Sequence, residues 1–330
     1  MSIRNDWKKE EVELIFNKPV LELIYEAATI HRKYNDPNEV QVSTLLSIKT
    51  GGCPENCSYC PQSIHHNTGL EPERLLSLDE VMTKASIAAQ NGSTRFCMGA
   101  AWRNVKNNKQ FEKVLKMVKG VNTLGMEVCC TLGMLTQEQA ERLKEAGLHA
   151  YNHNLDTSEG HYAEIITTRK YQDRLDTLEH VRETGLNVCS GGIIGLGETN
   201  EDRITMLHTL ANLPKHPESV PVNALVAVKG TPLENQKRVS IWEMVRMIAT
   251  ARIIMPKSQI RLSAGRQEMS VTEQAFCFMA GASSIFAGEK LLTTPNPDVN
   301  QDKMMFELLG LKPMAAFKGQ EKEVMATEFN

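Results

Sequence analysis

Several features that are typical of secreted, membrane and nucleic-acid-binding proteins are missing from this sequence. No apolar run in its 330 residues approaches the ~20 residues that a membrane-spanning helix needs. The first residues, 1–7, contain no apolar signal region, and acidic residues near them argue against a transit peptide. The net charge of −3 provides no basic footprint for nucleic acid. We therefore expect a cytoplasmic protein that acts without a membrane or nucleic-acid partner.

Cysteine is also scarce, because eight cysteines in 330 residues are too few for a disulfide scaffold. Without a secretory signal, cysteines more often bind metal, catalyse reactions or lie buried. Hydrophobic residues make up 41% and charged residues 23% of the chain, which is ordinary for a globular protein. The length allows one large barrel or two ordinary domains.

Three of the cysteines lie close together in a segment rich in turn-forming residues. Cys53, Cys57 and Cys60 have the spacing C-x3-C-x2-C, and the glycines and proline among them permit a tight loop. Three thiolates suit an iron–sulfur cluster that has one iron left open. The alternative is a structural zinc site closed by His65 or His66, since such sites normally have four ligands. The open ligand set predicts a reaction centre.

From about residue 42 the sequence alternates between short apolar strands and amphipathic helices. Strands are predicted over residues 44–49, 95–99, 126–132, 148–156, 186–194, 220–228, 259–264 and 284–287. Helices are predicted over residues 77–90, 109–119, 136–147, 171–184, 201–213, 241–254, 272–280 and 302–309. The pattern predicts an α/β fold, a (β/α)8 TIM-type barrel with an N-terminal helical extension. A doubly wound sheet is the alternative, because alternation does not prove closure.

The same pattern divides the chain into three parts. Residues 1–40 are expected to form helices that pack on the barrel, which spans residues 41–313. The polar residues 314–330 are expected to form a loosely ordered tail.

Strand alternation predicts a polar barrel interior. Successive strand residues face opposite sides, and the outer face packs on helices. On this basis Cys129 points inward and Cys130 points into the helix layer. The inward polar positions are Lys49, Cys97, Cys129, Asn154, Asp156, Cys189, Asn223 and Arg261. Because an unpaired buried polar group costs about 1–3 kcal/mol, so many of them indicate a polar ligand or cofactor inside the barrel.

Some of these signals have ordinary explanations. A single inward cysteine is commonly a small buried residue, but three inward cysteines on three different strands favour a second metal centre. Arg261 could instead form an internal salt bridge with Glu127 or Asp156. The four glycines within residues 191–198 lack the G-x-G-x-x-G order, so they indicate either a close approach of the backbone to a ligand or a plain loop.

Four segments carry a resemblance to a known family. The cysteine loop, with Tyr59 before its last cysteine, resembles the radical S-adenosylmethionine superfamily. Residues 52–63, 95–102, 151–157 and 261–266 are similar to the biotin synthase family within it. The likeness covers about residues 15–312, so it extends over nearly the whole chain.

The resemblance implies a radical mechanism with two iron–sulfur clusters. Cys53, Cys57 and Cys60 would hold a [4Fe-4S] cluster whose open iron binds S-adenosylmethionine. A [2Fe-2S] cluster would be held by Cys97, Cys129, Cys189 and Arg261. One electron from a flavodoxin-type donor would yield a 5′-deoxyadenosyl radical, which takes hydrogen from dethiobiotin. Sulfide from the smaller cluster would then close the ring of biotin, in the last step of biotin biosynthesis.

The resemblance also implies binding residues and a homodimer. S-adenosylmethionine would be contacted by Tyr59, Asn154, Asp156, Gly192 and Gly195. The substrate would be contacted by Lys49, Asn154, Asn223, Thr293 and Thr294. Guanidinium groups stay protonated in proteins, so whether Arg261 bonds to iron is left open. Cys130 departs from the family's usual pattern, but strand alternation places it away from the clusters.

Overall fold

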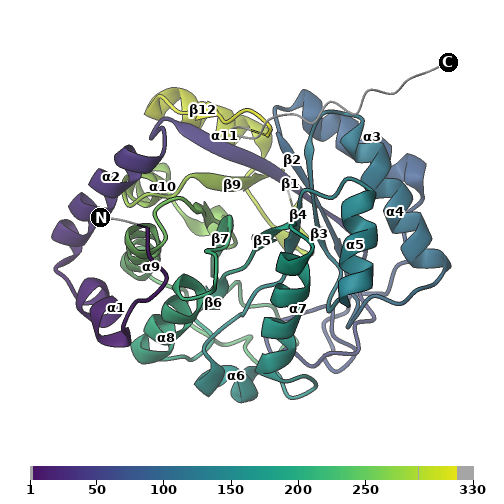
Figure 1. Ribbon diagram of the computed structural model, residues 1–330, viewed down its shortest axis with the longest axis horizontal. Helices are drawn as coiled ribbons and strands as arrows, with labels where there is room; N and C mark the ends of the chain where they lie inside the picture. Colours follow the sequence, from purple (N-terminus) through teal and green to yellow (C-terminus); the bar gives the residue numbers. More distant parts are fainter. Residues whose placement is uncertain (1–2, 289, 318–330) are drawn as a thin grey trace.

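Parallel strands close into a barrel in the computed structural model, which describes residues 3–288 and 290–317 (Figure 1). The strands of the ring are β1 (Glu39–Lys49), β2 (Arg95–Ala100), β3 (Glu127–Thr131), β4 (Ala150–Asn152), β5 (Asn187–Cys189), β6 (Gly192–Ile194), β7 (Ser219–Ala224), β8 (Gln259–Leu262) and β9 (Ser284–Ala287). β1 pairs with β2 on one side and with β9 on the other, so the sheet has no open edge there. Within the described residues β5 and β6 share the fifth of eight positions. The predicted (β/α)8 barrel is confirmed, and the doubly wound alternative is wrong.

The helices of the barrel form the outer layer around the strands (Figure 1). They are α3 (Leu78–Gln90), α4 (Lys109–Asn122), α5 (Gln137–Glu145), α6 (Glu159–Ile165), α7 (Tyr171–Glu183), α8 (Asn200–Ala211), α9 (Ile241–Ile254), α10 (Val271–Met279) and α11 (Val299–Leu309). The capping box expected at the start of α3 is present, because the Ser77 backbone N–H donates to the Glu80 carboxylate at 2.7 Å. α6 was not predicted from the sequence, and neither was the hairpin of β10 (Lys290–Leu291) and β11 (Thr294–Pro295).

Two helices precede the first strand, as predicted. α1 (Lys9–Phe16) and α2 (Val20–Tyr34) pack on the outside of the barrel against α8 and α9 (Figure 1). Val12, Phe16 and Leu23 are buried in this contact. The helices therefore cover one side of the barrel and leave its mouth free.

The last described residues lie against the amino-terminal end of the barrel. β12 (Lys312–Pro313) pairs with β1, and the Phe317 backbone N–H donates to the Glu127 carboxylate at 2.8 Å. The Phe317 ring meets the His149 ring edge-on at 5.4 Å. The rest of the predicted tail, residues 318–330, lies outside the described residues, as do residues 1–2 and 289.

Two buried histidines predict that stability falls in mild acid. Burial lowers the pKa of His31 to about 3, with the charge of Arg252 adding to the effect. Burial lowers the pKa of His149 to about 4, against the opposing charge of Glu127. Between about pH 6.5 and 4 the unfolded chain therefore binds more protons, and each group costs about 1.4 kcal/mol per pH unit. Urea unfolding of the cluster-free protein should show a lower midpoint at pH 5 than at pH 7. An unchanged midpoint would contradict the burial of neutral imidazoles.

Candidate active site

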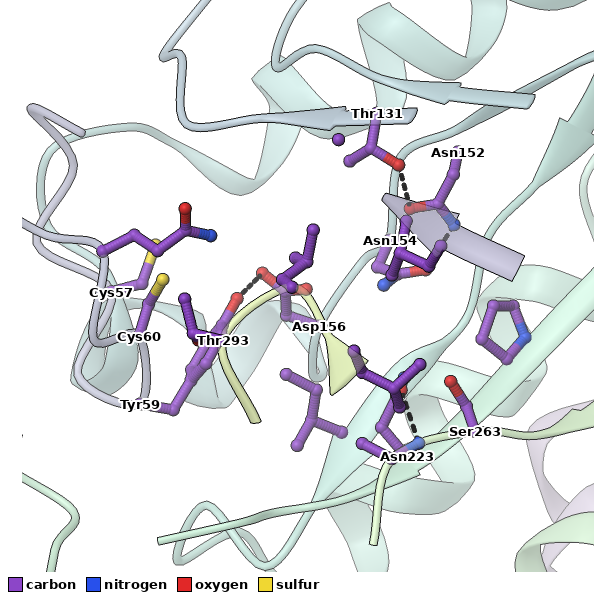
Figure 2. A pocket seen from close by; sticks show the side chains of 18 of the residues that line it. Cys57, Tyr59, Cys60, Thr131, Asn152, Asn154, Asp156, Asn223, Ser263 and Thr293 are labelled. Atoms are coloured by element: carbon purple, nitrogen blue, oxygen red, sulfur yellow. Dashed lines mark hydrogen bonds between the residues drawn. The ribbon is translucent and has the colours of Figure 1, made fainter. Parts of the chain in front are cut away.

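A cavity of about 330 Å³ lies at the carboxyl ends of the barrel strands, where barrel enzymes place their active sites. The two groups of cysteines approach it from different elements. The loop thiols come from the connection between β1 and α3, and Cys97 and Cys129 come from β2 and β3. Figure 2 shows Cys57 and Cys60 on one side of the cavity, facing polar side chains of the barrel across it.

The cysteine loop owes its shape to backbone conformation and hydrogen bonds. Gly51 and Gly52 both have φ of 69°, a region that glycine adopts without strain. The Cys53 backbone N–H donates to the Gln62 carbonyl, and the Ile64 backbone N–H donates to the Cys53 carbonyl, each at 2.9 Å. These bonds fold residues 53–64 into a closed loop whose three thiols line one cavity.

The zinc alternative finds no support in this loop. His65 Nε2 lies 3.1 Å from the Pro54 carbonyl, and His66 Nε2 lies 2.9 Å from the Cys57 carbonyl. Both rings therefore contact backbone oxygens. Among residues 3–288 and 290–317, no three histidine, cysteine or carboxylate side chains are placed to hold a single metal ion. A single zinc would require all its ligands within about 2.0–2.3 Å, whereas a multi-iron cluster keeps its thiolates farther apart.

A buried carboxylate fixes the back of the loop. Glu55 is 1% exposed, and its side chain forms ion pairs with Arg103 at 3.0 Å and with Arg169 at 3.2 Å. The Thr168 hydroxyl also donates to it. The side-chain Oδ1 of the neighbouring Asn56 accepts from the Thr168 backbone N–H at 3.2 Å. These contacts join the loop to the segment that follows β2 and to the connection between α6 and α7.

The barrel thiols lie together and carry unequal proton affinities. Hydrogen bonds with Cys129 lower the pKa of Cys97 and Cys189 and raise that of Cys129 itself. The positive charges of Arg261 and Arg95 lower the first two further. Cys97 and Cys189 are therefore the two thiols of this group that most readily form thiolates, the metal-binding form of cysteine.

Cys130 lies apart from this group. It is buried in the large apolar cluster between strands and helices, whereas Cys97 and Cys129 belong to a small cluster inside the barrel. Burial raises its pKa, which disfavours the thiolate. The strand alternation predicted from the sequence therefore holds for both β2 and β3.

Arg261 is held by neutral groups. Its guanidinium donates to Ser284 Oγ at 2.9 Å and to Gln41 Oε1 at 3.0 Å, and it lies over the Phe286 ring. The ion pair that the sequence left open, with Glu127 or Asp156, is absent from these described contacts. Glu127 instead pairs with Arg95 at 2.7 Å. The charge of Arg261 therefore has no carboxylate partner among the described residues and faces the barrel thiols.

A second polar group connects the loop to the barrel. The Tyr59 hydroxyl donates to Asp156 Oδ2 at 2.8 Å (Figure 2). The same carboxylate pairs with Arg174. Asp156 has a φ of 69°, which is uncommon for any residue other than glycine, asparagine or aspartate. Asn154 lies beside it, where its side-chain oxygen accepts from the Gly191 backbone N–H at 3.2 Å. Both residues line the cavity.

Comparison with known proteins identifies the family. Residues 47–210 match the radical SAM superfamily, and residues 221–312 match the biotin and thiamin synthesis associated domain. The chain is 66% identical over 316 residues to biotin synthase from Cytophaga hutchinsonii, covering 96% of this chain and 94% of that protein. The chain belongs to the biotin synthase family. It is also 61% identical over 311 residues to the mitochondrial biotin synthase of Arabidopsis thaliana, covering 94% and 82% of the two chains.

Solved structures show the same fold at low sequence identity. Methylornithine synthase is 17% identical, with a TM-score of 0.79 over 93% of this chain and 94% of that one. The FeFe-hydrogenase maturase HydG from Carboxydothermus hydrogenoformans is 18% identical, with a TM-score of 0.81 over 93% and 76%. These likenesses support the barrel architecture alone.

Membership of the biotin synthase family implies S-adenosylmethionine, a [4Fe-4S] cluster and a [2Fe-2S] cluster as cofactors. The residues present fit these groups. Burial raises the pKa of Cys57 to about 12 and that of Cys60 to about 11, so these thiols need a metal charge to become thiolates. Two guanidinium groups already favour the thiolates of Cys97 and Cys189, whereas Cys129, like the loop thiols, needs a metal charge to lose its proton. Each set thus has the donor chemistry of an iron–sulfur site.

The other residues expected at the site divide into two groups. Asn223, Thr293 and Thr294 line the cavity, whereas Lys49, Gly192 and Gly195 do not. A Cβ atom at Gly192 would lie 2.0 Å from Met206 Sδ, and one at Gly195 would lie 2.6 Å from Val239 Cγ2. Protein packing therefore accounts for the absence of a side chain at these two positions, and Gly192 lies in β6, not in a loop.

Lys49 leaves the interior because the first strand is irregular. The pairing of β1 with β2 shifts between Ser47 and Lys49, so simple alternation fails at this point. The Lys49 ammonium donates to the Gly51 carbonyl at 2.7 Å and faces a different cavity behind the cysteine loop.

Several residues around the site were not predicted from the sequence. They are Gln41, Ser43, Glu55, Arg95 as a partner of Glu127, Arg169, Arg174 and Ser284. Gln41 and Ser43 lie on the inward positions of β1, but the predicted strand began at residue 44. Arg169 and Arg174 reach the cavity from the start of α7, and no local pattern marks such a contact.

Proposed function

We propose that this chain inserts sulfur into dethiobiotin by radical chemistry and so forms biotin. The observation that carries the proposal is the convergence of two cysteine groups, from the loop and from the barrel, on one buried cavity. The family relationship supports the same reaction. A single-cluster radical enzyme would leave the barrel thiols and Arg261 without a role.

The cluster ligands follow from this convergence. Cys53, Cys57 and Cys60 would hold the [4Fe-4S] cluster, and Cys97, Cys129, Cys189 and Arg261 would surround the [2Fe-2S] cluster. When bound, the larger cluster with S-adenosylmethionine supplies a carbon-centred radical, and the smaller cluster supplies sulfur. Dethiobiotin offers unactivated C–H bonds that no general base can deprotonate, so the chain has to contain the radical. The cavity lies within the closed barrel, which limits the access of water.

The polar residues of the cavity would position the two small molecules. Tyr59 and Asp156 lie near the loop cysteines, and Asn154 lies on the other side of Asp156, beside Asn152 (Figure 2). All of Tyr59, Asn154 and Asp156 would contact S-adenosylmethionine. The Asn223 side-chain amide donates to the Gly192 carbonyl at 2.9 Å, and its oxygen accepts from the Ala264 backbone N–H at 3.3 Å. It would contact dethiobiotin in the interior, as would Asn154.

The remaining substrate contacts would come from the hairpin of β10 and β11 and from Lys49, on the other side of the cysteine loop. Thr293 and Thr294, on the hairpin of β10 and β11, would contact the carboxylate end of dethiobiotin. A contribution from Lys49 requires its side chain to turn from the Gly51 carbonyl toward the cavity. Gly192 and Gly195 would act on the cofactor indirectly, through the backbone that carries Ile193.

The proposal extends to partners and organisation. A flavodoxin-type protein would supply electrons in the cytoplasm. Residues 1–40 would form the helices that pack on the barrel, residues 41–313 the barrel itself, and residues 314–330 the tail. No described helix is both long and apolar enough to cross a membrane. Neither a membrane nor nucleic acid has a role in the proposed reaction.

A homodimer is proposed through the outer face of α2, α9 and α10. These helices pack beside one another, and Tyr25, Trp242 and Met279 are exposed on them. The Trp242 ring lies 5.6 Å from the ring of Phe276, which is also partly exposed. Exposed apolar side chains on neighbouring helices commonly mark a protein interface.

Anaerobic reconstitution with iron and sulfide tests the proposed reaction. Mössbauer and absorption spectra of the wild type should show two cluster types. Cys97→Ser should lose the smaller cluster and all biotin formation, while S-adenosylmethionine cleavage persists. Cys130→Ala is the matched control, because Cys130 follows Cys129 on β3 but is buried on the side of the strand that faces the helices, so this variant should retain both clusters.

Two outcomes would contradict the proposal. A wild-type protein that binds one cluster type would lack the sulfur source. Loss of the [2Fe-2S] signal in Cys130→Ala would overturn the assignment of the barrel ligands.

A further inference from the structure

A second cavity, of about 350 Å³, lies on the other side of the cysteine loop. Its lining comprises Lys49, Gly52, Pro54, Ala101, Trp102, Arg103, Asn104, Lys106, Asn108 and Gln110. Three of these side chains are cationic and three are amides. Within the described residues, no carboxylate belongs to the lining. The chemistry of this cavity therefore favours an anionic partner.

The positive charge is only partly balanced by nearby groups. Glu55 pairs with Arg103, but it is shared with Arg169, so one carboxylate serves two guanidinium groups. The Lys49 ammonium donates to the neutral Gly51 carbonyl. Lys106 is exposed on the segment that follows β2. A net positive surface thus lies directly behind the loop.

The position of this cavity is as informative as its charge. Gly52 and Pro54 belong to its lining, and they flank Cys53 on both sides along the chain. Ala101 and Trp102 line both cavities, so one thin wall separates the second cavity from the first. A partner seated there would contact the residues on both sides of Cys53 without entering the space for the substrates.

We infer that this cavity and its rim are the docking surface for the acidic one-electron donor protein. The inference rests on the proposed function, which requires an electron at the loop cluster in each round of radical formation. Acidic side chains of the donor would contact Lys49, Arg103 and Lys106. Complementary charge mainly accelerates encounter, so its loss should appear in the association rate.

The test compares two reductants on the reconstituted enzyme. Stopped-flow absorbance follows reduction of the loop cluster, and 5′-deoxyadenosine release reports the subsequent cleavage. A purified flavodoxin in its hydroquinone form is one reductant, and dithionite is the other. Lys106→Glu reverses an exposed charge in the cavity, and Asn104→Asp adds a negative charge there with little change in volume. Lys116→Glu, an exposed site on α4 outside the lining, is the matched control.

We expect Lys106→Glu to slow reduction by flavodoxin about tenfold at low ionic strength, with a smaller effect in Asn104→Asp. Lys116→Glu and Lys106→Arg should behave as wild type. The difference should disappear at about 1 M salt, where charges are screened within about 3 Å. Reduction by dithionite should be equal in all variants.

Equal flavodoxin rates in Lys106→Glu and wild type would overturn the docking surface. So would an equal loss with both reductants, since that would place Lys106 in the fold or in the binding of small molecules. Failure of the proposed function itself is distinguishable, because wild type would then form no biotin from dethiobiotin with either reductant.

Discussion

Replacing Glu127 with alanine is expected to lower the free energy of unfolding by about 3–5 kcal/mol. The Arg95 side chain is 5% exposed, and its carboxylate partner lies at 2.7 Å. Alanine would leave this guanidinium buried without a counter-charge beneath the barrel thiols. It would also remove the acceptor for the Gln41 side chain and for the Phe317 backbone N–H. Urea unfolding of the cluster-free protein measures the loss.

Two controls separate this effect from a general sensitivity to charge. Glu112→Ala breaks the ion pair with Arg142, in which the Glu112 side chain is 55% exposed, and should change stability by about 0–1 kcal/mol. The double variant Arg95→Met, Glu127→Leu should recover much of the loss, because an apolar pair of similar volume often replaces a buried ion pair at little cost. A Glu127→Ala protein as stable as Glu112→Ala would show that Arg95 reaches solvent.

The barrel and its cysteines were accessible from sequence because both follow from local periodicity. Strands that alternate in polarity have one face on the helices, so Cys129 and Cys130 could be assigned to opposite sides without coordinates. The capping box at Ser77 is equally local, since its two hydrogen bonds involve residues three apart. Closure of the barrel could not be predicted from local periodicity, because it depends on the pairing of β9 with β1, which are far apart in the sequence.

The wrong assignments have specific physical causes. Lys49 was placed inside by alternation, but the register shift after Ser47 directs it behind the loop. An ion pair between Arg261 and Glu127 was considered because both residues face inward. In the structure Arg95 lies directly opposite Glu127 in the pairing of β2 with β3 and forms the ion pair instead. Periodicity identifies the face on which a residue lies. Register, which periodicity does not contain, decides which residues meet on that face.

Glu55→Ala is expected to weaken iron binding at the cysteine loop by about 10–100-fold, the usual cost of losing a group that holds metal ligands in place. Glu55 ties the loop to Arg103, Arg169 and Thr168, which come from two other segments of the barrel mouth. Without it, Arg169 would remain buried beside the cavity with its charge unbalanced. Titration of the reconstituted protein with iron and sulfide, followed by electron paramagnetic resonance of the reduced [4Fe-4S] cluster, measures the effect.

The barrel thiols supply an internal control within the same molecule. Their environment depends on Arg261, Gln41 and Ser284 and has no contact with Glu55 among the described hydrogen bonds and ion pairs, so the [2Fe-2S] signal should persist. Glu55→Gln keeps an acceptor for the Thr168 hydroxyl while removing the charge, and it should bind iron with intermediate affinity. Equal loss of both signals would mean that Glu55 stabilises the barrel as a whole. Selective loss would show that a side chain without metal contact organises the loop on which the radical chemistry depends.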